Sequence, residues 1–589
     1  MNKEYITNKE TENKDVSDKN FVTKALVSIL ALLLAFMLTL TSCGSGNTTS
    51  SALTTTSADQ SLDNAVSKSE MFTERDLADD YDESAAETIT LSGTSAKTSA
   101  SSGVTIDGST VTITAEGVYV VSGTLTDGQI VVEADDSAKV QIVLKDASIT
   151  SETSAAIYVK SADKVFVTTA KGTNNTLANG GSFTADGDTN VDGAVFAKDD
   201  ITFNGSGSLT ITSPAGHGVV GNDDVKFGGG TYTITASAHG VKANDSARFA
   251  ESDVTITAGA DKDGVHVSDS DDASAAESDS FFYMADGTLT INSQDDGIHA
   301  DAEVKIEGGT IIVNESYEGI EGLAINISGG STTVTASDDG LNAAGGNSST
   351  SEGKTFGGDD WNGGGMMNDG GTNGSIVISG GKVHITAGGD GVDSNGSVEI
   401  TGGYTVVEGP TNGDTSVLDY NSEATVEAGT FIGTGGAGMA TSFSSADQGL
   451  IAVSVGNQSA GSTVTLKDEA GNVIAETTPE LDCAVVYIST EDMAQGNTYT
   501  LTAGNYSESI TLSENIYSDL AGGMGGKGAG LGGGGPRGGM NDQQGNMPEG
   551  GMQYGGGMQH GGGMKGGQAP GGAPDETTGA TQMSGGSAA

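Results

Sequence analysis

The sequence predicts an all-β fold: a right-handed parallel β-helix with about 21–25 residues per coil, followed by a small β-sandwich-like domain. Two observations predict it. A short pattern, an acidic or polar residue followed by glycine and an aliphatic residue, returns at nearly constant spacing. Between these returns, polar and apolar residues alternate in short stretches, as they do in β-strands. The glycines of the pattern are Gly193, Gly218, Gly240, Gly264, Gly297, Gly319, Gly340 and Gly391.

A single repeat shows the order of its parts. Short strands are expected at 297–300, 304–307 and 310–313. Gly308 and Gly309 separate the last two, and glycine permits the positive-φ turns that other residues resist. Short strands without a helical stretch, repeated at this period, fit the coil of a parallel β-helix, whereas the Leu/Asn frame of a leucine-rich repeat is missing from the sequence.

The chain begins with a predicted targeting segment, residues 1–43. Its apolar run at 25–40 has the length of a signal-peptide core and is short for a membrane span. The run leads into the motif LTSC, which resembles a bacterial lipobox and predicts lipid attachment at Cys43. An ordinary secretory signal with an incidental cysteine is the alternative. Residues 44–85 are rich in Ser and Thr and then acidic, which predicts a flexible tether.

Changes of composition set the other boundaries. The β-helix is predicted over residues 86–445, with insertions at 269–280 and 345–374. Residues 446–516 hold short strands separated by turn signals, which predicts the β-sandwich-like domain. Residues 517–589 are rich in Gly and Met without alternation, and this composition predicts a disordered tail.

The formal net charge of −54 restricts the possible partners. Nucleic-acid binding rests on Lys and Arg side chains that neutralise phosphates, so a nucleic-acid partner is not expected. A strongly acidic surface is instead compatible with gathering divalent cations.

Stacked coils turn the repeated pattern into ladders, because neighbouring strands lie about 4.8 Å apart. The first ladder consists of the residues before the glycines, and the second of the residues three positions further on. Early rungs are neutral or basic, and later rungs are acidic. The first ladder is His217, His239, Asp263, Asp296, Glu318, Asp339 and Asp390; the second is Val220, Lys242, His266, His299, Glu321, Asn342 and Asp393.

The acidic rungs predict a calcium site. Two carboxylates about 4.8 Å apart repel by about 3.5 kcal/mol at an effective dielectric constant near 20, so a column of them calls for a countercharge. Calcium binds carboxylate and amide oxygens at roughly 2.3–2.6 Å, which lets one ion bridge adjacent rungs. The alternative is turn chemistry, since Asp favours turns without any metal. His266 and His299 also leave open an extension of the site towards a transition metal.

The motifs at 318–322, 339–343 and 390–394, EGIEG, DGLNA and DGVDS, resemble those of a bacterial carbohydrate-binding β-helix family. That family is related in fold to pectate lyases, binds calcium on its coils and is associated with cellulose and polygalacturonate binding. The resemblance covers about residues 86–513 and implies a surface lipoprotein that binds polysaccharide. His217 and His239 depart from the family pattern. The implied metal ligands are Asp263, Asp296, Glu318, Glu321, Asp339, Asn342, Asp390 and Asp393.

Two function classes follow. In a binding module, calcium bridges protein carboxylates to the carboxylates of polygalacturonate, whereas a neutral glucan such as cellulose calls for stacking aromatics such as Trp361, Tyr317 or Tyr404. The alternative is a calcium-dependent pectate-type lyase that uses Lys242 or Lys262 as the base for β-elimination. Surrounding acids raise rather than lower a lysine pKa, which favours binding.

The expected protein is therefore a monomer at the extracellular face of the cell membrane, held there by its lipid anchor. Its expected partners are the polysaccharide and the membrane, and its expected cofactor is Ca²⁺.

Overall fold

The computed structural model describes residues 68–269, 280–343, 374–411, 413 and 415–520 of the 589. Within these ranges the chain is almost entirely β-structure, as predicted. The signal segment with Cys43, most of the tether, nearly all of both insertions, and the tail after residue 520 lie outside the described residues.

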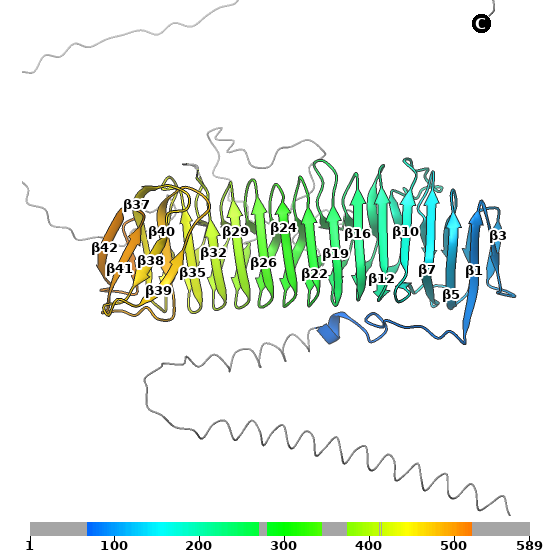
Figure 1. Ribbon diagram of the computed structural model, residues 1–589, viewed down its shortest axis with the longest axis horizontal. Helices are drawn as coiled ribbons and strands as arrows, with labels where there is room; N and C mark the ends of the chain where they lie inside the picture. The colour runs from blue at the N-terminus through cyan, green and yellow to red at the C-terminus, as the bar shows by residue number, and fades with distance from the viewer. Residues whose placement is uncertain (1–67, 270–279, 344–373, 412, 414, 521–589) are drawn as a thin grey trace, which may run out of the picture. The chain divides into compact units, whose positions relative to one another are not determined.

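Most strands belong to three columns in which neighbours pair in parallel, and each coil contributes one strand to each column (Figure 1). This pairing makes a solenoid-like fold. The first column is β10 (Asn174–Asn179), β13 (Ser208–Ser213), β16 (Gly230–Ala236), β19 (Ser252–Thr257), β22 (Thr288–Asn292), β24 (Thr310–Glu315), β26 (Ser331–Ala336), β29 (Lys382–Ala387), β32 (Tyr404–Glu408) and β35 (Thr430–Gly435).

The second column carries the residues that follow the repeated glycines. It is formed by β11 (Gly193–Ala197), β14 (His217–Gly221), β17 (Val241–Ala243), β20 (Val265–Val267), β23 (Ile298–Ile306), β25 (Ile320–Ile327), β27 (Leu341–Ala343), β30 (Val392–Ser394) and β33 (Leu418–Tyr420).

The third column includes the second halves of β23 and β25, which continue through two columns. Its other strands are β12 (Asp200–Gly205), β15 (Asp224–Phe227), β18 (Ser246–Phe249), β21 (Phe281–Met284), β28 (Ser375–Ile378), β31 (Ser397–Ile400) and β34 (Glu423–Val426).

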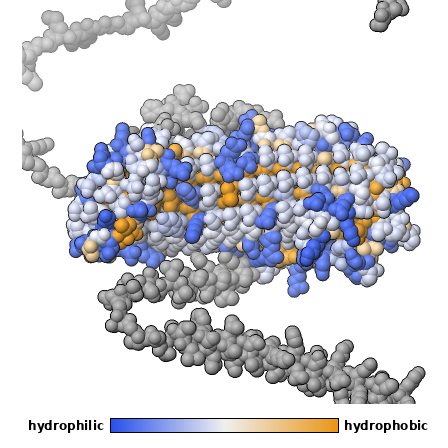
Figure 2. Space-filling view, in the orientation of Figure 1, coloured by the Kyte–Doolittle hydropathy of each residue, from blue (hydrophilic) through white to orange (hydrophobic). Residues whose placement is uncertain are grey.

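Alternation along each strand builds a continuous core. In β19 every second side chain is buried, which places Val254 and Ile256 inside and Thr255 outside. Inside the third column, Phe203, Phe227, Phe249 and Phe282 stack from coil to coil with ring centroids 4.9, 5.1 and 5.5 Å apart. On the outer face of the first column, Figure 2 shows a band of apolar residues that runs along the row of strands between more polar ones.

The two kinds of repeated glycine have different physical causes. The second glycine of each Gly-Gly turn has a positive φ, 74° at Gly309 and 73° at Gly330, as predicted. The glycines of the ladders do not. A Cβ at Gly340 would lie 2.2 Å from a methyl of Ile385, and one at Gly264 would lie 2.3 Å from a methyl of Ile291. Glycine is required there because the backbone lies directly on the core.

Residues 68–85, hereafter the strap, correct the prediction of a flexible tether. The strap starts with a helical turn at 68–71 and lies along the third column and its continuation, β9 (Lys164–Thr169) and β7 (Lys139–Ser151) (Figure 1). Phe72 is buried against Ala250 and Tyr283. The sequence interpretation failed because the acidic and polar composition conceals one apolar anchor and one buried carboxylate.

That carboxylate is Asp76, which is fully buried. Its Oδ1 lies 2.8 Å from Lys164 Nζ and accepts a hydrogen bond from the Thr202 hydroxyl at 2.9 Å. Its Oδ2 accepts the Thr73 backbone N–H, also at 2.9 Å. Burial works to raise the pKa of Asp76, but Lys164 and these hydrogen bonds outweigh burial and lower it. The strap is thus held by a satisfied buried ion pair.

Non-parallel pairings occur at both ends of the columns. The N-terminal strands include the antiparallel pairs β1–β2 and β3–β4, and parallel pairing through β5 to β9 leads into the columns. Their bounds are β1 (Ala86–Gly93), β2 (Ser95–Thr98), β3 (Val104–Asp107), β4 (Thr110–Ile113), β5 (Gly117–Leu125), β6 (Gln129–Glu133) and β8 (Ile157–Ser161).

At the other end, β40 (Cys483–Ser489) pairs antiparallel with β35 and covers its free edge. The region predicted as a β-sandwich-like domain is therefore hydrogen-bonded to the coils. It includes a four-stranded antiparallel sheet in the order β39-β38-β41-β42. The strands are β36 (Ser445–Ala446), β37 (Leu450–Gln458), β38 (Val464–Lys467), β39 (Val473–Thr477), β40 (Cys483–Ser489), β41 (Thr498–Ala503), β42 (Tyr506–Thr511) and β43 (Ile516–Ser518).

Candidate metal-binding ladders

Both predicted ladders exist: the first lies mostly two residues before the strands of the second column, and the second lies within those strands. In the second ladder, Lys242 pairs with His266, then His299, Glu321, Asn342 and Asp393 follow in register. In the first ladder, the repeated glycines from Gly218 to Gly340 donate their N–H to the carbonyl of the next rung, as Gly264 does to Asp296 and Gly319 to Asp339. All eight predicted metal ligands therefore lie on these two rows.

The side chains of the first ladder also support the backbone. Asp263 Oδ1 accepts the N–H of Asp296 at 3.0 Å, and Asp339 Oδ1 accepts that of Asp390 at 2.6 Å. His217 Nδ1 and His239 Nδ1 accept the N–H of the following rung in the same way. These contacts explain why either His or Asp occurs at this position, since both side chains place a hydrogen-bond acceptor close to the backbone N–H of the next rung.

Left-handed turn geometry does not account for the ladder acids. Among the described residues, only Asp146, Glu251 and Asp261 combine a side chain with a positive φ, and none of them belongs to a ladder. Left-handed backbone is therefore not the reason for Asp at these rungs.

The early rungs form a stack of imidazoles. The rings of His217, His239, His266 and His299 lie face to face, with centroids 5.2, 4.4 and 4.9 Å apart. Asp263 Oδ2 lies 2.6 Å from His266 Nδ1 and 3.3 Å from His239 Nδ1. Burial opposes ionisation of Asp263, yet these imidazoles hold its pKa well below the ordinary value. Burial lowers the pKa of His266 to about 4.

His299 lies between carboxylates on both sides. Its Nδ1 is 2.5 Å from Glu321 Oε2 and 3.4 Å from Asp296 Oδ2, while its Nε2 is 3.2 Å from Asp301 Oδ1. Burial opposes the charged imidazole, but Glu321, Asp296 and Asp301 outweigh burial and raise the pKa of His299 well above its usual value. Sequence reasoning missed Asp301, because it follows His299 within β23 and belongs to neither ladder.

The later rungs bring four carboxylates together without positively charged side chains paired to them in the described part of the chain. Burial, reinforced by neighbouring carboxylates, raises the pKa of Glu318 to about 9, of Asp339 to about 8, of Asp390 to about 6 and of Asp393 to about 7. No Lys, Arg or His of the described residues forms an ion pair with any of these four carboxylates. The charge of this cluster is thus unbalanced when the carboxylates are ionised.

Asn342 supplies a second sign of an incomplete cluster. It is buried, and its Nδ2 donates to Glu318 Oε2 at 2.7 Å. Its Oδ1 is also buried and has no hydrogen-bond partner within the described ranges. Buried amide oxygens are normally satisfied, so this one fits a ligand position for a cation that binds oxygen.

Three groups of ligand atoms lie within 4.8 Å of one another in the described part of the chain: His239, Asp263 and His266; Asp296, His299 and Glu321; and Asp263, Asp295 and Asp296. They include the predicted ligands Asp263, Asp296 and Glu321, but the other five predicted ligands are not in these groups. Sequence reasoning missed Asp295 and also Asp419, which extends the second ladder beyond Asp393. The Asp-Asp pair at 295–296 was the available signal for Asp295.

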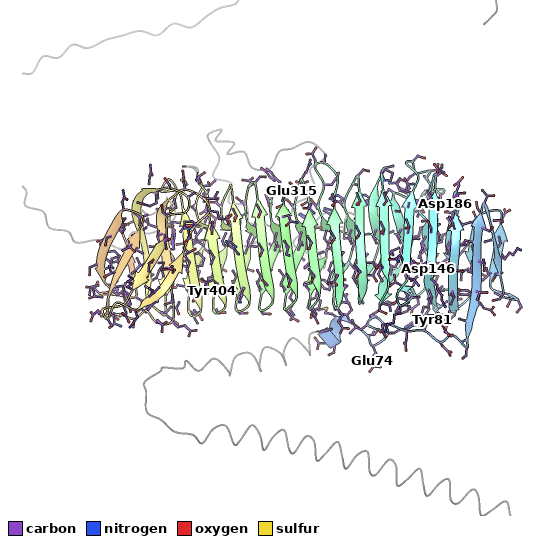
Figure 3. All side chains as sticks on the ribbon, viewed as in Figure 1. Glu74, Tyr81, Asp146, Asp186, Glu315 and Tyr404 are labelled. Carbon is purple, nitrogen blue, oxygen red and sulfur yellow. The ribbon has the colours of Figure 1, made fainter. Side chains whose placement is uncertain are left out.

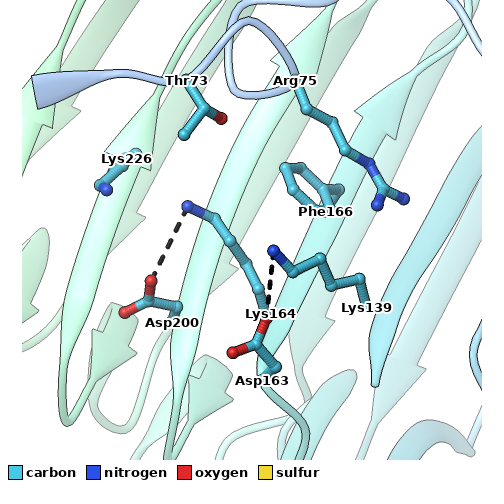
Figure 4. Close-up of a pocket in the computed structure, with 8 residues that line it drawn as sticks. All are labelled: Thr73, Arg75, Lys139, Asp163, Lys164, Phe166, Asp200 and Lys226. Atoms are coloured by element: carbon cyan, nitrogen blue, oxygen red, sulfur yellow. Dashed lines mark ion pairs between the residues drawn. The ribbon is translucent and has the colours of Figure 1, made fainter. Parts of the chain in front are cut away.

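A separate pocket of about 440 Å³ lies between the strap and the strands beneath it (Figure 4). Arg75 covers the ring of Phe166 at 4.2 Å. The lysines around the pocket are paired with carboxylates, and the pocket lies where the strap meets these strands. Its lining residues are Thr73, Arg75, Lys139, Asp163, Lys164, Phe166, Asp200 and Lys226.

The chain is similar to proteins that are named for a carbohydrate-binding domain. Residues 107–358 match a family described as carbohydrate-binding domain-containing protein. The match supports a carbohydrate-binding family. A carbohydrate-binding domain-containing protein of Acetivibrio thermocellus is 35% identical over 136 residues, which cover 23% of this chain and 48% of that protein. The chain therefore matches about half the length of this carbohydrate-binding relative.

Among solved structures, the chain is similar to one titled as the polysaccharide lyase-like protein from C. thermocellum, gadolinium derivative. The sequence identity is 27% and the TM-score is 0.37, over 44% of this chain and 96% of that chain.

In the described ranges, no helix has the length and apolar character needed to cross a bilayer.

Proposed function

We propose that the protein is a cell-surface carbohydrate-binding protein that recognises plant-type polysaccharide, polygalacturonate and/or cellulose, through a calcium-bearing, right-handed parallel β-helix. The observation that carries the proposal is the set of later rungs, which combine buried and half-buried carboxylates that lack an ion-pair partner among the described residues with the unpartnered oxygen of Asn342. The carbohydrate-binding family match supports the ligand class.

The donor set fits calcium at these rungs. Calcium would be held by Glu318, Asp339, Asn342, Asp390 and Asp393, all of which offer oxygen. When bound, it supplies positive charge that offsets the carboxylates and attracts those of an acidic polymer. Asp263, Asp296 and Glu321 were predicted as calcium ligands too. Each of them contacts an imidazole, a ligand that suits transition metals better than calcium.

Cellulose binding has a narrower basis. Of the aromatic candidates, Trp361 lies outside the described residues, and the side chain of Tyr317 is hydrogen-bonded to Asp338. Tyr404, on β32, is 43% exposed (Figure 3). An exposed ring can stack on a sugar, and its position on the first column separates it from the calcium rungs.

The test is binding of the purified protein to polygalacturonate and to cellulose, each with calcium and with a chelator. We expect polygalacturonate binding in calcium and its loss in chelator, because the −54 protein otherwise repels an acidic polymer. Equal binding in both conditions, or none in either, would contradict the proposal. A rising ultraviolet absorbance from unsaturated uronate ends would instead reveal the alternative function, a pectate-type lyase.

We also propose that the chain is anchored to the membrane by lipid on Cys43, because the LTSC motif follows the apolar run. Replacing Cys43 by Ser removes the thiol that carries the lipid, so the variant is expected to leave the membrane fraction and enter the soluble extracellular fraction. Immunoblotting after cell fractionation measures this. An unchanged membrane fraction would show that lipid on Cys43 is not what holds the protein.

A further inference from the structure

We propose that Asp296, His299 and Glu321 bind a divalent transition-metal ion of the zinc class, at a site distinct from the calcium rungs. The proposal does not depend on calcium or polysaccharide binding. It rests on the placement of three ligand atoms from adjacent coils. It also rests on a further carboxylate, that of Asp301, which contacts the other nitrogen of the imidazole.

Asp296, His299 and Glu321 each offer one ligand atom, and the three atoms lie within 4.8 Å of one another. His299 Nδ1 is the nitrogen that faces Asp296 Oδ2 and Glu321 Oε2. Asp296 and His299 come from the same coil, and Glu321 is paired in register with His299 on the next coil. One imidazole nitrogen and two carboxylate oxygens are a donor set that zinc accepts. Three protein ligands also leave a coordination position for an oxygen atom of water or of a bound sugar.

The second observation concerns the other ring nitrogen of His299, Nε2. His299 Nε2 lies 3.2 Å from Asp301 Oδ1, and Asp301 Oδ2 accepts a hydrogen bond from the Ser268 hydroxyl at 2.8 Å. Asp301 is buried, with 4% of its surface exposed. Metal-ligating histidines characteristically donate their other N–H to a carboxylate, which fixes the tautomer and turns the free nitrogen toward the metal. Asp301 therefore aims Nδ1 at Asp296 and Glu321.

Distances show which ligand has to move. Zinc bonds of about 2.0–2.2 Å in a tetrahedral arrangement separate ligand atoms by roughly 3.3 Å. Asp296 Oδ2 and His299 Nδ1, 3.4 Å apart, already meet this distance. Glu321 Oε2, at 2.5 Å from His299 Nδ1, has to withdraw by about 0.8 Å. Its side chain is the most exposed of the three, so it is the one free to adjust.

Neighbouring rungs support the arrangement. The N–H of Asp296 is held by Asp263 Oδ1 at 3.0 Å, which fixes the backbone of the first ligand.

The experiment titrates the purified, chelator-treated protein with Zn²⁺, and separately with Co²⁺ as a spectroscopic probe, in excess Ca²⁺. We expect Zn²⁺ to bind despite the calcium, and Co²⁺ to give visible absorption bands from an imidazole-containing site. His299→Gln should abolish both signals. Asp301→Asn, which keeps the shape of the orienting group, should weaken Zn²⁺ affinity about 10–100-fold.

The matched control is Asp390→Asn with Asp393→Asn, which alters the calcium rungs and should leave Zn²⁺ affinity unchanged. If His299→Gln fails to fold, as judged by circular dichroism, Asp301→Asn decides the question alone. Unchanged Zn²⁺ affinity in Asp301→Asn, or displacement of Zn²⁺ by equimolar Ca²⁺, would overturn the proposal.

Discussion

Replacing Asp390 and Asp393 together by Asn is expected to abolish calcium binding at the later rungs, and with it calcium-dependent polygalacturonate binding. The amides keep the size of the side chains, and the amide oxygen introduced at position 390 can still accept the N–H of Ser416, so the fold should persist. What is lost is the charge on which calcium affinity depends. Calorimetric titration with calcium, then with polygalacturonate at fixed calcium, measures both effects.

The same variant should change stability with opposite signs in the two metal states. In chelator, the folded-state pKa values of about 6 and 7 exceed the ordinary 3.8, so the folded protein binds these protons more tightly than the unfolded chain does. Wild-type stability should therefore fall as pH rises from about 4 to about 7, and the variant should lack the part of this fall that comes from Asp390 and Asp393, while Glu318 and Asp339 still contribute theirs.

With calcium at a hundredfold excess over Kd, the wild type instead gains about 2.7 kcal/mol, and the variant does not. Thermal melts test both statements. Asp107→Asn with Asp253→Asn is the matched control, because it removes two charges from exposed positions. Calcium affinity of the Asp390/Asp393 variant equal to that of the wild type would mean that these rungs only shape the coil.

Replacing Asp76 by Ala is expected to release the strap from the solenoid. The change removes the partner of Lys164 and leaves its charge, only 10% exposed, without its closest carboxylate. Breaking one side of a buried ion pair costs about 3–5 kcal/mol. Since the strap precedes β1 and contributes no strand to the coils, we expect local detachment and not unfolding of the coils. Hydrogen exchange of residues 68–85 should become fast, while exchange in β12 and β15 stays slow.

Acid should reproduce this effect in the wild type. The pKa of Asp76 is lowered by folding, so its contribution is complete above about 4 and is lost as pH falls through the folded-state value below that. Glu74→Ala is the control, because Glu74 is an exposed carboxylate on the same segment (Figure 3). Equal protection of the strap in Asp76→Ala and Glu74→Ala would refute the role given to Asp76.

The spacing of the glycines was enough to predict stacked coils and the two ladders, because a parallel strand column repeats each position once per coil. The cause of the ladder glycines was not visible in the sequence. Whether a glycine serves positive φ, as Gly309 does, or close backbone packing, as Gly340 does, depends on which core methyl lies beneath it. Periodicity reports only that the position recurs.

Partners that lie outside the periodic pattern could not be predicted. Asp301 stands behind His299 because β23 continues past the ladder, and an acid at this position is not part of the repeated pattern. The strap could not be predicted either. Asp76 and Lys164 are 88 positions apart in the sequence, and no repeat relates them. Calcium and its ligands remain predictions, because their support is chemical complementarity.

The strap also determines how the molecule carries tension. Lys68 lies 2.7 Å from Glu251, beside β18, whereas β1 begins at Ala86, several coils away. A pull on the chain before Lys68 therefore loads the side of the solenoid and not its first strand. The contacts of Phe72, Arg248 and Asp76 resist that pull, and each must rupture before force reaches the β1–β5 ladder. A pull applied before Lys68 is therefore expected to break these strap contacts before it breaks the hydrogen bonds between β1 and β5.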